Sequence, residues 1–157
     1  GCYSRPEVGN HILIGSEDPE CDTLDYIDDP DAYDTDFSDQ WSTQVMREAQ
    51  RIPALRIPNQ RSGVVDLYDA SDDWIPIYDK SDLPGYYMAV GTSGNQYKNA
   101  PVVGKLMAEL IEACEAGHDH DRDPVTFGMH YTRRTCNIGF YSRLREINNE
   151  SSFSVIG

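Results

Sequence analysis

Residues 86–117 read YYMAVGTSGNQYKNAPVVGKLMAELIEACEAG and contain the most informative pattern of the sequence. Its first five residues are aromatic or apolar and predict a strand. A loop with two glycines follows, and Asn99 then stands where a helix N-cap is expected, with Pro101 in the first turn. Gly117 marks the end of the helix. The apolar residues between them recur at helical spacing, at Val102, Val103, Leu106, Met107, Leu110, Ile111 and Cys114.

The loop between this strand and this helix has the composition of an anion-binding turn. Backbone N–H groups and a helix N-terminus there would face a ligand that carries negative charge. Gly91 and Gly94 permit positive φ or a close approach of the ligand, and Lys98 supplies a cation. An ordinary turn with a surface lysine explains the same spacing, so both interpretations stay open at this point.

The remaining pattern predicts short elements, and together they give an α+β fold. A turn rich in glycine and proline separates two extended runs near the start of the chain, which predicts a hairpin. The expected elements are strands at 2–4 and 11–14, a helix capped by Ser38 or Asp36 and ending near Pro53, a strand at 63–69, and a turn with an edge strand over 72–78. The helix should bury one face, made of Trp41, Val45, Met46, Ala49 and Ile52.

Composition excludes several classes of function. The chain has 157 residues and a formal charge of −14, which suits one acidic globular domain. Without a basic block it is a poor partner for nucleic acid or for an anionic membrane surface. No apolar run is long enough to span a bilayer, and the four cysteines lack metal-site or disulfide-scaffold spacing. We therefore expect reduced thiols and a cytoplasmic location.

Two polar clusters are candidate metal sites, and neither is complete. Eleven acidic residues lie between positions 17 and 39, and some of them alternate as calcium ligands do. This stretch lacks the glycine and the final glutamate of such a loop, so a solvated loop is favoured. His118, Asp119 and His120 form a compact group after the helix, but no third ligand lies nearby, and a solvated loop is again favoured. We expect no metal.

The quoted stretch, extended to residues 84–111, closely resembles the carboxyl-terminal FAD-contacting segment of FAD-dependent amine and amino-acid oxidoreductases. This family includes D-amino-acid oxidase, sarcosine oxidase and glycine oxidase. Its pattern is a strand, then Gly-x-Ser-Gly-x-x-x-Lys-x-Ala-Pro, then a helix. The hairpin region and the run Asp73-Trp74-Ile75-Pro76 are similar to family segments in the same order. The resemblance covers roughly residues 1–117.

The resemblance implies a division of the chain. Residues 1–84 would be a portion of the substrate domain, built on an antiparallel sheet with flanking helices. Residues 85–117 would be the strand–loop–helix unit of the FAD domain, and residues 118–157 a carboxyl-terminal extension. We expect the arginines of this extension to form surface or inter-domain ion pairs.

The resemblance also implies roles for particular residues. Lys98 would lie near the flavin ring and the substrate, and Tyr68 would face the substrate, so these two are the candidate catalytic residues. A surface lysine and a half-buried strand tyrosine are the alternatives. FAD would be bound noncovalently, because the strand lacks the flavin-linking cysteine of sarcosine oxidases. The residues expected to contact the flavin are Gly91, Thr92, Ser93, Gly94, Asn95 and Lys98.

One departure from the family limits what the chain can do. Complete members begin with a βαβ unit carrying G-x-G-x-x-G, which holds the FAD pyrophosphate, and this sequence does not contain that motif. We expect the carboxyl-terminal part of a longer enzyme that oxidises a small amine or N-alkyl amino acid. Its partner would be the amino-terminal FAD-binding part, and the isolated chain would be inactive. The alternative is a non-catalytic acidic α+β interaction module.

Overall fold

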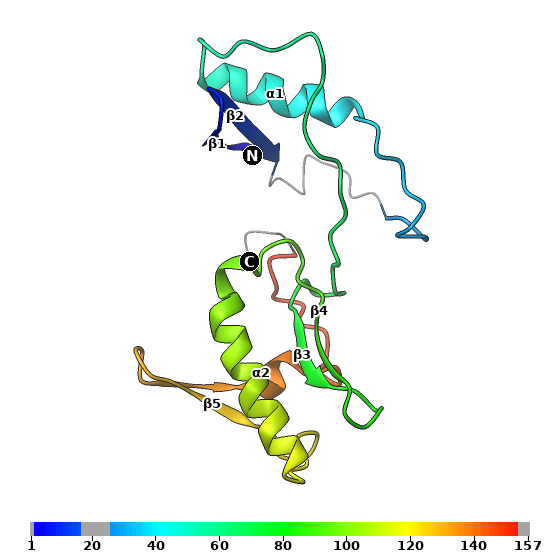
Figure 1. Cartoon of the computed structure of the whole chain (residues 1–157), viewed down its shortest axis with the longest axis vertical. Helices are drawn as coiled ribbons and strands as arrows, with labels where there is room; N and C mark the ends of the chain where they lie inside the picture. The colour runs from blue at the N-terminus through cyan, green and yellow to red at the C-terminus, as the bar shows by residue number, and fades with distance from the viewer. Residues whose placement is uncertain (1, 17–25, 154–157) are drawn as a thin grey trace. The chain divides into compact units, whose positions relative to one another are not determined.

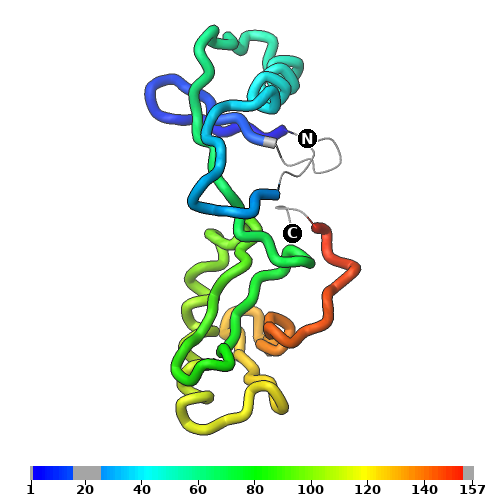
Figure 2. The backbone as a smooth tube through the Cα atoms, turned by 90° about the vertical axis from the view of Figure 1, so that its right-hand side faces the viewer, coloured from blue at the N-terminus to red at the C-terminus, as the bar shows by residue number. Residues whose placement is uncertain are grey.

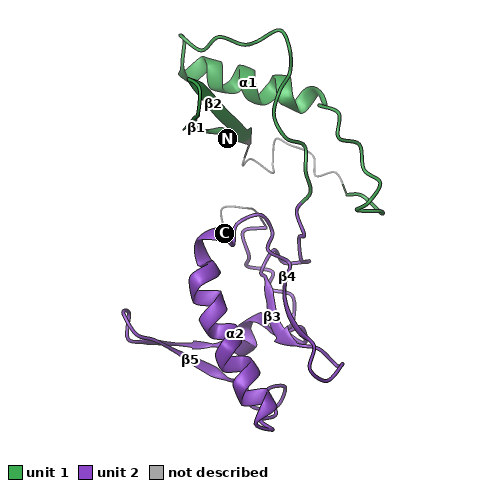
Figure 3. Ribbon diagram, in the orientation of Figure 1, with its two compact units in different colours: residues 1–67 green, residues 68–157 purple. Residues whose placement is uncertain are grey.

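The computed structural model describes residues 2–16 and 26–153 (Figure 1). The chain divides into two compact units, unit 1 with residues 1–67 and unit 2 with residues 68–157 (Figure 3). Each unit combines a helix with short antiparallel strands, which confirms the predicted α+β class. Within the described residues, no helix has both the length and the apolar character that a membrane crossing requires.

Unit 1 contains a hairpin packed against a helix. β1 (Cys2–Glu7) pairs antiparallel with β2 (His11–Ser16), so the predicted hairpin is confirmed and its strands are longer than expected. Gly9 and Asn10 turn the chain between them with φ values of 78° and 61°. Glycine and asparagine are the residues that adopt this left-handed region most readily.

The helix of unit 1 begins and ends where the sequence predicts. α1 (Asp39–Arg51) follows Ser38, whose side chain accepts a hydrogen bond from the Gln40 N–H, so Ser38 is the N-cap. Val45 is buried, whereas Met46, expected in the core, is 58% exposed. The helix therefore buries a narrower stripe than the sequence suggested.

The strand predicted over residues 63–69 is wrong, because this stretch has no regular secondary structure. Val64 is 85% exposed. The carboxylate of Asp66 accepts a hydrogen bond from the neighbouring N–H of Leu67 at 2.8 Å. Aspartate side chains compete in this way with a strand ladder for backbone N–H groups, and no described segment pairs with this one.

Unit 2 begins its regular structure with a second hairpin. β3 (Ile77–Lys80) pairs antiparallel with β4 (Tyr87–Val90). The sequence predicted the second strand, and it placed the first slightly too early, since the strand starts after Pro76. Gly85, with a φ of 76°, lies in the turn that joins the two strands. The described strands of the chain pair as three separate two-stranded sheets.

The predicted strand–loop–helix unit is confirmed. After β4 the chain passes through a loop and the short helix η1 (Tyr97–Asn99) into α2 (Ala100–Glu115), which has proline in its first turn. Gly117 ends the helix with a φ of 90°, and its N–H donates to the carbonyl of Cys114 at 2.9 Å. This helix contributes Leu106 and Leu110 to the buried core of unit 2.

A third hairpin closes the core of unit 2. β5 (Thr126–Met129) pairs antiparallel with β6 (Arg134–Asn137), and the short helix η2 (Ile138–Tyr141) follows. The chain then returns alongside β3, so segments far apart in the sequence lie together (Figure 2). The buried cluster consists of Tyr78, Leu106, Leu110 and Ile138.

Candidate functional site

The loop between β4 and α2 has a backbone that only a few residue types tolerate. Gly91, Ser93 and Gly94 have φ values of 67°, 50° and 75°. Serine in this region costs of order 1 kcal/mol, so the surrounding contacts must hold it there. The side chain of Ser93 is fully buried, and its hydroxyl donates to the carbonyl of Gly91 at 3.2 Å. The loop is therefore a fixed structure.

Asp69 holds the loop from a neighbouring segment. Its carboxylate accepts a hydrogen bond from the Thr92 N–H at 3.0 Å and another from the Thr92 hydroxyl. The backbone carbonyl of Asp69 accepts a third bond, from the Ser93 N–H at 3.3 Å. Burial alone would raise the pKa of Asp69, but the hydrogen bonds from Thr92 outweigh it and lower that pKa. The carboxylate is thus charged near neutral pH.

These bonds change the expected role of two loop residues. The N–H groups of Thr92 and Ser93 donate to Asp69, so in this structure they are occupied within the protein. The sequence contained no signal for this contact, because the partners are 23 residues apart.

Tyr68 and Gly94, which are distant in the sequence, are in contact. A Cβ atom added to Gly94 would lie 2.7 Å from an atom of the Tyr68 ring. The ring therefore packs directly on the glycine backbone, and 62% of the tyrosine remains exposed. The candidate substrate-facing residue and the candidate cofactor loop thus form one surface.

Gln96 fastens the far end of the loop to the core. Its side-chain oxygen accepts hydrogen bonds from the Tyr78 hydroxyl at 2.8 Å and from the Asn99 amide at 2.9 Å. Its own amide donates to the side chain of Asn95. Burial, with a smaller effect of Tyr141, raises the pKa of Tyr78 to about 12, so this hydroxyl stays a donor. Sequence reasoning missed Gln96.

Lys98 lies in η1 and is exposed. Among residues 2–16 and 26–153 its ammonium group has no ion pair. Asn99 occupies the expected N-cap position of α2, but its side chain makes no capping hydrogen bond. The N–H groups of Asn99 and Ala100 are bonded within η1, so the positive character of this end of the loop comes from Lys98 and from the dipole of α2.

This arrangement fits one edge of a flavin. The space beside Gly94 is taken by the Tyr68 ring, so the feature that suits a group gaining negative charge is the exposed positive end at Lys98. The available contacts are backbone and lysine contacts to one side of a ring system.

The arginines of the extension are not at the surface as expected. Arg143 and Arg145 are only 15% and 14% exposed at their side chains, and they pair with aspartates inside unit 2. Arg143 bonds Asp79 at 3.1 Å and Asp121 at 2.9 Å. The prediction of surface pairs is therefore wrong for these two residues, because each one meets a buried carboxylate. Their partners at Asp73 and Asp79 lie within the range 1–84 that the sequence assigned to another portion of the chain.

The two candidate metal clusters have other partners. The N–H groups of Asp31 and Asp36 donate to the side chains of Asp29 and Asp34, both at 2.9 Å, within an exposed loop. His120 is 1% exposed, so the expectation of a solvated residue is wrong there. In the part of the chain that the structure describes, no group of three or more His, Cys, Asp or Glu residues is placed to hold a metal ion.

Comparisons with known proteins agree with the resemblance seen in the sequence. Residues 1–110 match the family described as "DAO: FAD dependent oxidoreductase". A protein from Bos taurus named "FAD-dependent oxidoreductase domain-containing protein 1" is 29% identical over 118 residues, which cover 71% of this chain and 23% of that protein. This chain thus corresponds to about a quarter of its relative's length. No solved structure matches the chain significantly. Because the matched region spans more than half of its residues, the chain belongs to the FAD-dependent oxidoreductase family, whose cofactor is FAD.

Proposed function

We propose that the chain is the carboxyl-terminal part of an FAD-dependent oxidoreductase that oxidises a small amine or N-alkyl amino acid. The observation that carries this proposal is the contact between Tyr68 and Gly94, because it joins the two regions that the family uses around its flavin. Bound FAD would supply the hydride acceptor for the carbon next to the substrate nitrogen. The chain's own residues would orient the substrate and stabilise negative charge at one edge of the flavin ring.

Lys98 would act through its charge. Its exposed ammonium group at the start of α2 adds to the positive end of the helix dipole and would stabilise negative charge at the adjoining ring edge. Tyr68 would orient the substrate with the exposed face of its ring, while its other face rests on Gly94. The amino-terminal FAD-binding part would hold the pyrophosphate.

The test compares three variants of the full-length protein. Lys98→Met should slow flavin reduction or reoxidation by ~10–1000-fold, as expected for loss of one preorganised electrostatic contact. Tyr68→Phe should act mainly on substrate binding or on flavin reduction. Lys105→Met is the matched control, because Lys105 is an exposed lysine of the same charge on the following helix. Stopped-flow absorbance measures both half-reactions.

The outcome that overturns this proposal is equal, small effects of the two lysine substitutions, which would make Lys98 a plain surface charge. A second measurement concerns the isolated chain. It should purify without the yellow flavin spectrum and should not reduce an electron acceptor when amine is added, because contacts to one ring edge do not offset the entropy of binding a whole dinucleotide. A stoichiometric flavin spectrum would contradict this.

A further inference from the structure

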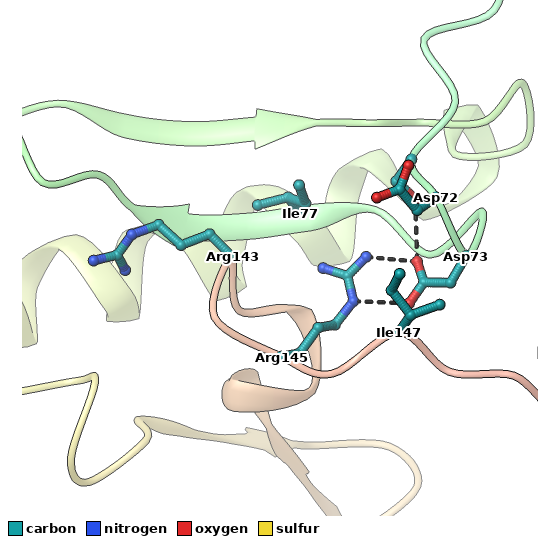
Figure 4. Close-up of a pocket in the computed structure, with 7 residues that line it drawn as sticks. Asp72, Asp73, Ile77, Arg143, Arg145 and Ile147 are labelled. Carbon is teal, nitrogen blue, oxygen red and sulfur yellow. Dashed lines mark hydrogen bonds and ion pairs between the residues drawn. The ribbon is translucent and has the colours of Figure 1, made fainter.

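Arg145 and Asp73 form a bidentate ion pair in unit 2 (Figure 4). The Arg145 Nε donates to one carboxylate oxygen at 3.1 Å, and a terminal nitrogen donates to the other at 2.7 Å. The Asn148 N–H adds a third bond to the same carboxylate at 3.2 Å. Asp73 is 1% exposed, so this pair is shielded from solvent, where charge-assisted bonds are strongest. Residues 142–151, which carry both donors, are called the tail segment below.

Asp73 lies in a tight turn that depends on these bonds. The Ile75 N–H donates to the Asp73 carboxylate at 3.1 Å, and the Arg145 guanidinium donates to the Ile75 carbonyl at 2.7 Å. Trp74 between them has a φ of 61°, which is unfavourable for a bulky residue. The turn therefore keeps a strained backbone, and Arg145 contacts it on both sides of the strained residue.

The same turn supports the candidate flavin loop. Ser71 donates a hydrogen bond to the Ile75 carbonyl at 2.7 Å, and its Cβ would lie 3.3 Å from a Cβ added at Gly91. Two residues earlier, Asp69 holds the N–H groups of Thr92 and Ser93. The segment from residue 69 to residue 75 thus contacts the loop at one end and Arg145 at the other.

We propose that the tail segment positions the flavin-facing loop, with Arg145 as the positioning residue that acts through Asp73. This segment lies beyond residue 110, where the match to the family ends. The inference rests on the proposed function, because it assigns a purpose to a loop that the proposal places at the flavin. Arg145 itself need not touch cofactor or substrate.

A second arginine makes it possible to distinguish the positioning role of Arg145 from simple attachment of the tail segment. Arg143 also anchors the tail segment, but to Asp79, Asp82 and Asp121 and not to the turn at Asp73. The tail therefore keeps one anchor when Arg145 is replaced. Loss of Arg145 should loosen the turn and the loop before it releases the tail.

The experiment follows amide hydrogen exchange and the flavin together in the full-length holoenzyme. In Arg145→Gln, peptides that cover residues 91–99 should exchange ~10–100-fold faster than in the wild type, since local opening loses a charge-assisted pair. The flavin absorption spectrum and reduction potential should shift as well. Arg145→Lys should give an intermediate result, because it keeps the charge but loses the bidentate geometry. If the glutamine variant does not fold, the lysine variant carries the same comparison.

Arg122→Gln is the matched control, since Arg122 is 89% exposed and pairs with Asp119 alone among the described residues. It should leave both measurements unchanged. Unchanged exchange of the loop in both Arg145 variants would overturn the inference. Faster exchange of the loop with an unaltered flavin would instead overturn the proposed function, because the loop would then not face the flavin. An altered flavin in Lys98→Met with no effect of Arg145→Gln would overturn the inference alone.

Discussion

Both units bury carboxylates, and Asp79 in unit 2 is bonded differently from Glu48 in unit 1. In unit 2, Asp79 is fully buried and accepts hydrogen bonds from the Ser142 hydroxyl at 3.0 Å and from the Arg143 N–H at 2.8 Å. The Arg143 guanidinium pairs with it at 3.1 Å, and the Lys80 N–H bonds its other oxygen at 2.7 Å. Both oxygens of this carboxylate are thus satisfied.

In unit 1, Glu48 on α1 is 4% exposed and has fewer partners. One oxygen accepts from the Ser4 hydroxyl at 2.7 Å and so joins the helix to β1. The other has no hydrogen bond among the described residues and lies 3.7 Å from the Arg51 guanidinium. A buried charge is expensive unless it is fully bonded, so loss of charge should destabilise the protein much more at Asp79 than at Glu48.

The largest effect should come from Asp79→Asn. The asparagine amide carries no charge to balance Arg143. Its NH₂ group would also replace a carboxylate oxygen that accepts hydrogen bonds, so two donors would face each other. We expect a loss of about 3–5 kcal/mol in the free energy of unfolding of unit 2, measured by urea denaturation followed through hydrogen exchange. Asp82→Asn is the control, because Asp82 pairs with the same arginine but is 93% exposed, and it should cost less than about 1 kcal/mol.

A second prediction concerns how the stability of unit 2 depends on pH, through the ionisable groups near Asp79 and Arg143. Burial lowers the pKa of His120, whose ring nitrogen accepts a hydrogen bond from the Val125 N–H at 3.0 Å. The unfolded chain therefore takes up this proton more readily, and stability should fall as the pH drops below the ordinary value of 6.5. The hydrogen bonds from Arg143 and Lys80 lower the pKa of Asp121 to about 2.

The stability contributed by Asp121 is complete above its unfolded pKa of 3.8 and should be lost as the pH falls toward about 2. Unit 2 should thus weaken in two acid steps, seen as the free energy of unfolding against pH. Asp121→Asn should reduce the lower step without removing it, because hydrogen bonds also lower the pKa of Asp69 and Asp73. His120→Gln should remove the upper step, while the exposed His118→Gln should leave both. A flat profile between pH 7 and pH 5 would contradict the role given to His120.

The sequence predicted what local patterns determine. The hairpin of β1 and β2 and the helices α1 and α2 depend on turn residues, caps and apolar spacing within one segment, and all were confirmed. The strand at 63–69 failed because strands need a partner, and no local pattern says whether one is present. Hairpin β5–β6, which was not predicted, has short strands of four residues each.

The site was predictable only in part, for the same reason. Family resemblance, not spacing, indicated Tyr68 and the loop at Gly94, and the structure places them in contact. The contacts of Asp69 with Thr92 and of Arg145 with Asp73 join residues 23 and 72 positions apart. Aspartate and arginine are common surface residues, so nothing in the sequence distinguishes these from solvated charges. Their selection depends on the tertiary fold.

A smaller effect is expected at the glycines of unit 2. In Gly94→Ala, a residue with a φ of 75° gains a Cβ that meets the Tyr68 ring at 2.7 Å. The exposed ring moves aside, and the backbone strain should cost about 1–2 kcal/mol of the free energy of unfolding. Gly104→Ala on α2 is the opposite case, because nothing lies within 4 Å of the added atom, and it should gain about 0.5–1 kcal/mol. Equal effects at both positions would mean that Gly94 does not have the positive φ of this structure.

The smallest effect should come from Glu48→Gln, which removes a buried charge in unit 1 as Asp79→Asn does in unit 2. The amide oxygen keeps the bond from the Ser4 hydroxyl, and the NH₂ group replaces an oxygen that has no hydrogen bond among the described residues. Removing the buried charge offsets the loss of the 3.7 Å contact with Arg51, so the free energy of unfolding should change by less than about 1 kcal/mol. Glu109→Gln on the exposed side of α2 is the control for a surface glutamate. A loss as large as that of Asp79→Asn would show that Glu48 is a fully bonded charge in solution, and the contrast between the two units would then lie in their apolar cores and not in how they satisfy buried acids.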